Sequence, residues 1–136
     1  MEEDMLQKSL LIIGAGGIGT TVVDLLVPAL ARIALGANIT LMDGDTVEAS
    51  NLGHQNYSRA DIGTFKVDAL AEKWSHAEGV QVNSMPENLR NLEQLEGYDL
   101  VVVCVDRPEP RRLVHSLDVP WLCLLYTSDA ADEEDS

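Results

Sequence analysis

A glycine-rich loop directly after a short apolar run is the feature that most constrains the fold of this chain. Residues 14–19 read GAGGIG, a G-x-G-x-x-G pattern, and follow the apolar residues 10–13. Glycines at a turn from a strand into a helix leave backbone N–H groups free to face phosphate, at the positive end of the helix dipole. The same loop also occurs where a strand and a helix merely pack closely, so its context has to separate the two interpretations.

An acidic residue after the next apolar segment completes the pattern of a nucleotide-binding turn. Asp43 follows residues 38–42, at the position from which a carboxylate reaches a ribose hydroxyl in dinucleotide-binding folds. Asp43 and Asp45 flank Gly44 and could also simply form a type I turn. If the site is functional, Asp45 supports the loop or a cation. We therefore predict that Asp43, Asp45 and the loop glycines bind a nucleotide. The glycines are Gly14, Gly16, Gly17 and Gly19.

The apolar periodicity alternates between strands and helices along the chain. It predicts strands at 9–13, 38–42, 80–84, 100–105 and 119–122, helices at 18–35, 66–76 and 110–117, and a helical turn at 92–95. This alternation implies a parallel sheet with right-handed crossovers. The predicted fold class is α/β: a Rossmann-like, doubly wound, mainly parallel sheet with helices on both faces. Ligands bind such sheets at the carboxyl ends of the strands.

The polar segment from residue 43 to about residue 64 carries more hydrogen-bonding side chains than ribose binding needs. They are Asn51, His54, Gln55 and Arg59, and Lys66 follows. A site that splits a triphosphate places donors and cations against the charge that builds on the leaving group. Lys66 opens a predicted helix, and we expect it to face inward. A lysine at the start of a helix opposes the helix dipole, which favours a role in the site over a solvated surface position. Arg59 suits an exposed surface equally well.

Asp106 closes the fourth predicted strand in the sequence CVDR. A carboxylate at a strand end can hold Mg²⁺ against phosphate oxygens. An aspartate followed by prolines is also a good helix N-cap, and this alternative stays open.

With these residues assembled, the chain resembles the ThiF/MoeB superfamily, the adenylating enzymes related to ubiquitin-activating enzyme. Four ordered motifs between residues 10 and 122 carry the resemblance: GAGGIG, DGDTVEASNLGHQ, GTFK and CVDR. It implies that ATP and Mg²⁺ bind, and that the C-terminal carboxylate of a ubiquitin-like or sulfur-carrier protein attacks the α-phosphate to give an acyl-adenylate. By this resemblance Asp43 holds the ribose, Asp106 binds Mg²⁺, and the phosphates contact Asn51, Gln55 and Lys66.

Two residues depart from the family pattern: His54 stands where the family has arginine, and Arg107 where it has asparagine. A neutral ring at His54 weakens phosphate contact unless it is protonated or Arg59 takes its place. His54 thus supports one alternative, a non-catalytic relative that binds a nucleotide or a partner protein. The other alternative, an NAD-dependent oxidoreductase, shares the glycine loop and Asp43 but has no need of residues 50–55 or Lys66.

Length and composition bound the remaining possibilities. A chain of 136 residues is one domain or a piece of one, and its formal net charge of −14 argues against a nucleic-acid partner. No apolar stretch reaches the roughly 20 residues of a membrane span. The acidic start and the two cysteines give no sign of secretion, so we expect a cytoplasmic protein. The family resemblance implies a homodimer.

The last residues have an unusual sequence. Residues 123–133 read CLLYTSDAADE, which back-translates to DNA that resembles the adapter of transposase-based sequencing libraries. We therefore expect an ATP-binding, Rossmann-like adenylation domain over residues 1–122, truncated at its C-terminus, and a non-native tail over residues 123–136. The family's zinc cysteines and thiol-transfer cysteine would then be missing, which can leave a folded but inactive chain.

Overall fold

The computed structural model describes residues 8–33, 36–53, 55, 57–105, 108–116 and 120–124. Within this part of the chain, five strands form one sheet in the order β3-β2-β1-β4-β5, and every neighbouring pair is parallel. The strands are β1 (Lys8–Ile13), β2 (Ala37–Met42), β3 (Val80–Met85), β4 (Leu100–Val103) and β5 (Trp121–Cys123). The predicted α/β, Rossmann-like fold class is confirmed.

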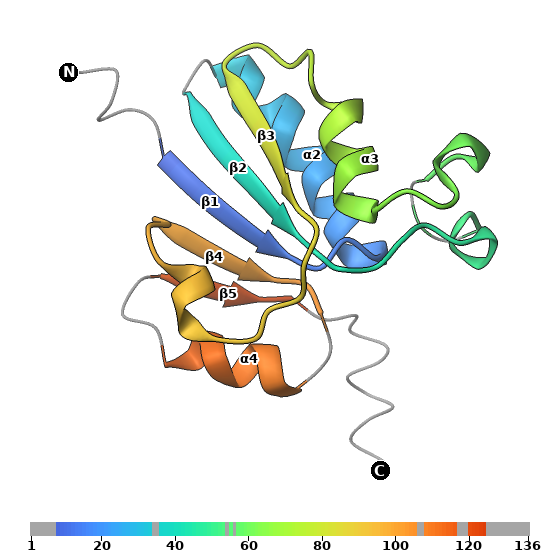
Figure 1. Cartoon of the computed structure of the whole chain (residues 1–136). Coiled ribbons are helices and arrows are strands. Elements are labelled where there is room, and N and C mark those ends of the chain that lie inside the picture. Colours follow the sequence, from blue (N-terminus) through green and yellow to red (C-terminus); the bar gives the residue numbers. More distant parts are fainter. Residues whose placement is uncertain are drawn as a thin grey trace.

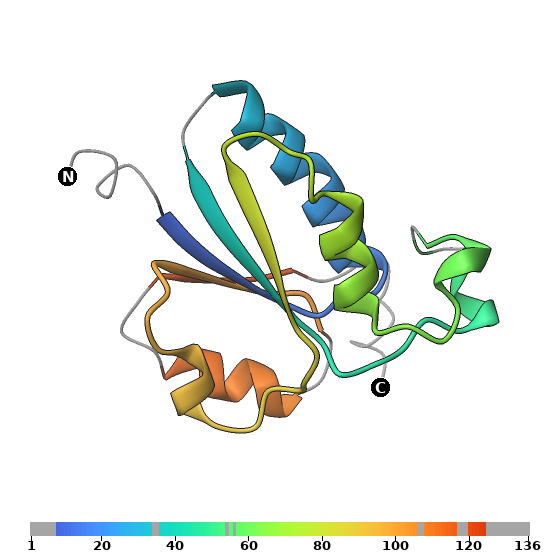
Figure 2. The same ribbon diagram turned by 45° about the horizontal axis from the view of Figure 1, so that its top comes forward.

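Helices cover both faces of the sheet (Figure 1). Helices α2 (Gly17–Ile33) and α3 (Lys66–Lys73) lie on one face, whereas α4 (Pro108–His115) and the 3-10 turn η3 (Leu92–Leu95) lie on the other. The turned view separates the same two layers (Figure 2). The chain runs outward from β1 to β3 and then returns to β4 beside β1. This reversal creates a switch point between β1 and β4, which is where doubly wound sheets bind ligands.

Each face of the sheet has its own apolar core, because the central strands are covered on both sides. All of Val101, Val102 and Val103 in β4 are buried, as a continuous apolar strand in the middle of a parallel sheet requires. The core under α2 and α3 includes Val23, Val27, Ile39, Leu41, Val67 and Leu70. The core under η3 and α4 includes Leu11, Ile13, Leu95, Val103 and Val114.

Asp24 on α2 holds the end of α3. Its carboxylate accepts a hydrogen bond from the Trp74 indole N–H at 2.8 Å and pairs with the Lys73 ammonium at 3.1 Å. Trp74 leaves the helical backbone region, so α3 ends at Lys73 and not at residue 76 as the sequence predicts. Helix α2 contains both Asp24 and Pro28. Neither it nor any other helix in the described ranges is long and apolar enough to cross a membrane.

The other element ends differ slightly from the prediction. Strand β4 stops at Val103, two residues early, because its neighbour β1 ends opposite it at Ile13. Helix α4 begins at Pro108 and not at Pro110, since a proline is compatible with the first turn of a helix. Strand β5 includes Cys123, a residue that the sequence analysis assigns to the tail.

Candidate nucleotide-binding site

Three glycines of the loop between β1 and α2 have different steric roles. Gly14 has a φ of 104°, and a Cβ added there would lie 2.6 Å from Cγ1 of Val105. A Cβ at Gly19 would lie 2.0 Å from the Gly14 carbonyl oxygen, so only glycine lets α2 start this close to the loop. At Gly16 the nearest described atom would be Nε2 of Gln55, at 3.7 Å. Packing therefore explains Gly14 and Gly19, whereas Gly16 leaves room for a ligand to approach the backbone.

The loop leads directly into the first turn of α2. Gly17 is the first residue of the helix, and the carbonyl of Gly16 accepts hydrogen bonds from both the backbone N–H and the hydroxyl of Thr20, each at 2.9 Å. The N–H groups of a first helical turn have no partner inside the helix. They lie at the positive end of the helix dipole, so this end of α2 is suited to an anion such as phosphate.

Asp43 connects the end of β2 to the glycine loop. The residue is 9% exposed, and its carboxylate accepts the N–H of Ala15 at 2.7 Å and the N–H of Asp45 at 2.8 Å. A carboxylate offers about four acceptor positions, so these two hydrogen bonds leave capacity for a ribose hydroxyl. Asp45 itself is exposed, and its carbonyl accepts the backbone N–H of Lys66.

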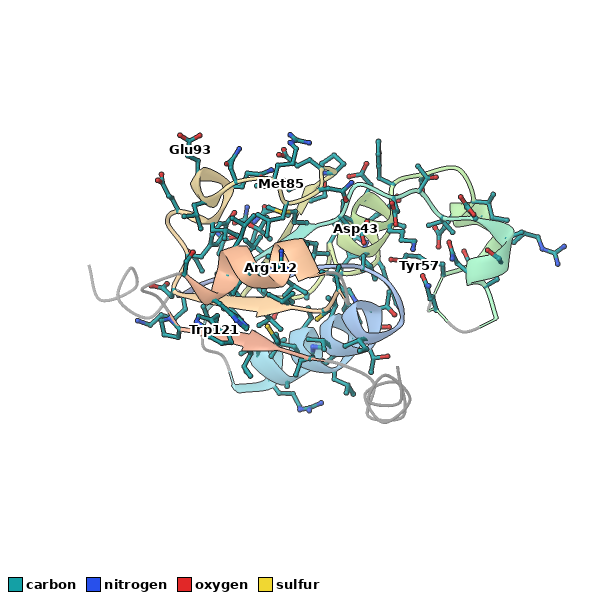
Figure 3. The ribbon with its side chains drawn as sticks, turned by 90° about the horizontal axis from the view of Figure 1, so that it is seen from below. Asp43, Tyr57, Met85, Glu93, Arg112 and Trp121 are labelled. Atoms are coloured by element: carbon teal, nitrogen blue, oxygen red, sulfur yellow. The ribbon has the colours of Figure 1, made fainter. Side chains whose placement is uncertain are left out.

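A second side chain, which could not be identified from the sequence, binds the same loop residue. The Tyr57 hydroxyl donates to the Ala15 carbonyl at 2.5 Å, and the side chain is almost fully buried. Burial first, and then the nearby Asp43 carboxylate, raise the pKa of Tyr57 far above its ordinary value, so the hydroxyl keeps its proton. Figure 3 shows both labelled side chains at the side of the molecule where the polar loop leaves the sheet. The only signal in the sequence is an aromatic residue inside a polar segment.

The polar loop between β2 and α3 folds back on itself. The N–H of Val47 donates to the carbonyl of Thr64 at 2.8 Å, and the N–H of Lys66 donates to the carbonyl of Asp45 at 3.0 Å. Between these contacts the loop forms the 3-10 turns η1 (Ala49–Asn51) and η2 (Arg59–Asp61). The first residue of α3 is therefore fixed beside the turn that contains Asp43.

Lys66 is buried, with 7% of its surface exposed, so the predicted inward orientation is confirmed. The ion pairs found within the described ranges involve other residues and give its ammonium no counter-charge. Burial of an ammonium without a partner has a high free-energy cost. A bound anion would remove this cost, because it would neutralise the charge inside the protein.

The other predicted polar side chains take different positions. Gln55 faces Gly16, and its Oε1 is buried without a hydrogen-bond partner in the described structure. Asn51 ends η1, where its Oδ1 accepts the N–H of Glu48 at 2.7 Å in a local cap. Arg59 is exposed at the start of η2. The structure thus brings Gln55 to the glycine loop, uses Asn51 in a cap and leaves Arg59 on the surface.

The predicted metal ligand and both departures from the family pattern fall outside the described residues. These positions are Asp106, His54 and Arg107. Among the residues that the structure does describe, no group of three or more histidine, cysteine or acidic side chains is arranged to hold a metal ion. Binding of Mg²⁺ by Asp106 therefore stays a prediction.

Asn88 covers the turn after β2 from the loop that follows β3. Its Oδ1 accepts the N–H of Gly44 at 3.0 Å, and a Cβ at Gly44 would lie 2.9 Å from the same oxygen. Sequence reasoning misses this contact as well, because the two residues are far apart in the chain. Asn88 and Asp43 together hold the turn in place.

Cys104 follows β4 directly below the glycine loop. Its N–H donates to the carbonyl of Ile13 at 2.7 Å, and burial, with a smaller contribution from Cys123, raises the pKa of its thiol to about 12. A thiol in this state is a poor nucleophile at neutral pH. Cys104 therefore contributes to packing as a small apolar residue.

Comparison with known proteins identifies the family of the chain. The sequence matches the model of the ThiF family over residues 2–122. It is 38% identical over 121 residues to the adenylyltransferase and sulfurtransferase uba4 of Pyricularia oryzae, covering 82% of this chain and 23% of that protein. It is 34% identical over 122 residues to the corresponding Yarrowia lipolytica protein, covering 85% of this chain and 29% of that protein. The chain thus spans less than a third of these curated relatives.

Solved structures give the same result. The Escherichia coli tRNA N6-threonylcarbamoyladenosine dehydratase TcdA, in complex with ATP, superposes with a TM-score of 0.72 at 25% identity, covering 85% of this chain and 50% of that one. Escherichia coli MccB, in complex with AMPCPP and MccA, superposes with a TM-score of 0.70 at 26% identity, covering 91% and 39%. Because the family model matches nearly the whole chain and the fold and glycine loop agree with it, the protein belongs to the ThiF family.

Proposed function

We propose that this chain is the nucleotide-binding part of an ATP-dependent adenylyltransferase that activates the C-terminal carboxylate of a ubiquitin-like or sulfur-carrier protein. The observation that carries the proposal is Lys66, a buried ammonium without a counter-charge in the described structure. It lies beside the turn after β2, next to the glycine loop. A polyphosphate would provide that counter-charge.

Two further features support a nucleotide at this position. The Gly16 backbone is open to close approach. The neighbouring Gln55 has a buried Oε1 without a donor in the described structure, which a hydroxyl or amino group of a nucleotide, and not its phosphate, would satisfy. The uba4 relatives are named adenylyltransferase and sulfurtransferase, and the TcdA and MccB structures contain ATP and AMPCPP. The NAD-dependent oxidoreductase and the non-catalytic relative receive no support from the comparisons.

In the proposed reaction a carboxylate oxygen attacks the α-phosphorus of ATP, the bond from that phosphorus to the bridging oxygen breaks, and pyrophosphate leaves. Negative charge builds on the pyrophosphate, where Lys66 and the Gln55 amide N–H would stabilise it. The N–H groups at the start of α2 would hold a phosphate, and Asp43 would accept a ribose hydroxyl. Mg²⁺ at Asp106 would add further neutralisation. The proposal also includes a homodimer and a cytoplasmic location.

Calorimetric titration of the chain with ATP and Mg²⁺, and separately with NAD, tests the proposal. We expect ATP to bind and Lys66→Met to weaken its affinity by about tenfold or more, because a charge-assisted contact is lost. Lys73→Met is the matched control, since Lys73 lies on the same helix but is exposed and pairs with Asp24. Preference for NAD, or equal weakening by both substitutions, would reject the proposal. ATP–pyrophosphate exchange with an added ubiquitin-like or sulfur-carrier protein then tests the adenylation step.

A further inference from the structure

We infer that Tyr57 is a positioning residue of the nucleotide site, whose hydroxyl orients the peptide between Ala15 and Gly16 so that the Gly16 N–H faces the ligand. The inference rests on the proposed function and deepens it. It adds a residue that touches neither the ligand nor the reacting atoms but sets the direction of a backbone donor that does.

The geometry of one peptide group carries the inference. The Tyr57 hydroxyl donates to the Ala15 carbonyl oxygen at 2.5 Å, and the same peptide group ends in the N–H of Gly16. In a trans peptide the carbonyl and the N–H point in opposite directions. A hydroxyl that holds the carbonyl on the buried side therefore directs the N–H to the other side. Within the described structure this N–H has no backbone hydrogen-bond acceptor.

The preceding peptide group is held as well. The N–H of Ala15 donates to Oδ2 of Asp43 at 2.7 Å, so both polar backbone groups of this buried residue are bound by side chains. Asp43 begins the polar segment that carries the other candidate side chains, and Tyr57 lies within it. Side chains from another segment therefore hold the backbone of the glycine loop in place. This agrees with a loop that is preorganised for its ligand.

The hydroxyl of Tyr57 is suited to this task because it remains a donor. It is buried and close to Asp43, and both conditions oppose its ionisation. A hydrogen bond to a carbonyl also polarises the N–H at the other end of the peptide and strengthens it as a donor. Packing alone would require only the ring of Tyr57. Removal of the hydroxyl therefore tests the positioning role and leaves the packing intact.

The first experiment compares Tyr57→Phe with Tyr98→Phe in the full chain. Tyr98 packs against the core on the opposite face of the sheet, so its substitution removes a hydroxyl without touching the loop. We expect Tyr57→Phe to weaken ATP affinity about fivefold to tenfold, the effect of one lost hydrogen bond, and Tyr98→Phe to leave it unchanged. In the free chain, the amide resonance of Gly16 should shift in Tyr57→Phe and stay in place in Tyr98→Phe.

A second measurement uses the wild-type chain, with the tyrosine resonances assigned from the Tyr57→Phe and Tyr98→Phe variants. In a chain labelled with 3-fluorotyrosine, ATP should shift the ¹⁹F resonance of Tyr57 and not that of Tyr98. The reason is that the ligand and the Tyr57 hydroxyl would bind opposite ends of the same peptide group. Tyr57→Phe that binds ATP like the wild type, or a Gly16 resonance that does not move, overturns the inference. A wild-type chain that binds no ATP instead rejects the proposed function, and the assigned role of Tyr57 fails with it.

Discussion

The carboxylate of Asp43 and the backbone N–H of Ala15 form a buried hydrogen bond of 2.7 Å. Ala15 follows β1 and Asp43 follows β2, so the bond joins the ends of two neighbouring parallel strands. The residue predicted to contact the ribose is therefore also part of the structure that shapes the glycine loop. Any change at Asp43 is expected to affect stability and ligand binding together.

Asp43→Ala should lower the free energy of unfolding by about 2 kcal/mol, because the buried N–H of Ala15 loses a charged acceptor. Urea denaturation of the free chain measures this loss. Asp45→Ala is the control: its carboxylate is exposed, so the change should stay within about 0.5 kcal/mol. Equal losses in the two variants would contradict the role given to the Asp43–Ala15 hydrogen bond.

Substitution of Gly16 and Gly19 by alanine should have opposite consequences. Gly16→Ala introduces a methyl group with no described atom closer than 3.7 Å, so the chain should fold normally but bind ATP at least about tenfold more weakly, because the methyl blocks the approach of phosphate. Gly19→Ala places a methyl group 2.0 Å from the Gly14 carbonyl oxygen and should prevent folding. Circular dichroism and calorimetry distinguish the two. Tight ATP binding by Gly16→Ala would show that the ligand does not approach this residue.

The sequence pattern predicts the parts of this fold that depend on local periodicity and on motifs. The loop GAGGIG predicts the strand, the turn and the helix around it, and the continuous apolar run at Val101 predicts a central strand. The conflict of Lys66 with the helix dipole indicates a functional position, and the side chain is buried as predicted. Each of these signals lies within a few residues of the feature that it predicts.

The contacts that complete the site could not be predicted in this way. Tyr57 meets Ala15 and Asn88 meets Gly44 only because the chain folds, and the two partners of each pair are 42 and 44 residues apart. Nothing in the local pattern distinguishes Asn88 from other polar loop residues. For Asn51 the missed contact is local. The family resemblance assigns this residue to phosphate, but its side chain accepts a hydrogen bond from the N–H of Glu48, three residues earlier.

Stability should fall at alkaline pH, and Cys104 should account for part of the fall. Burial raises the pKa of Cys104 from an ordinary 9.0 to about 12, so the folded state keeps a proton that the unfolded state releases. This contribution is complete below pH 9 and is lost as the pH rises toward 12. In urea denaturation, Cys104→Ala should lower stability at pH 7.5, and its difference from the wild type should shrink above pH 9. A difference that is constant with pH would contradict the assignment.

Lys66→Met should separate stability from function. Methionine has a similar length and no charge, so the substitution removes a buried ammonium that has no ion pair in the described structure. We expect the free chain to become more stable by about 1 kcal/mol or more, because the desolvation cost disappears.

Thermal melting with and without ATP measures the effect of Lys66 on stability and on ligand binding separately. ATP should raise the melting temperature of the wild type, since a ligand that binds only the folded state stabilises it, and should raise that of Lys66→Met less at the same ATP concentration. The control Lys73→Met removes an exposed ion pair with Asp24, which is worth at most about 1 kcal/mol, and should keep the full response to ATP. If Lys66→Met is instead less stable than the wild type and keeps the full response to ATP, the buried lysine serves the fold, and the main support for a triphosphate at this site is lost.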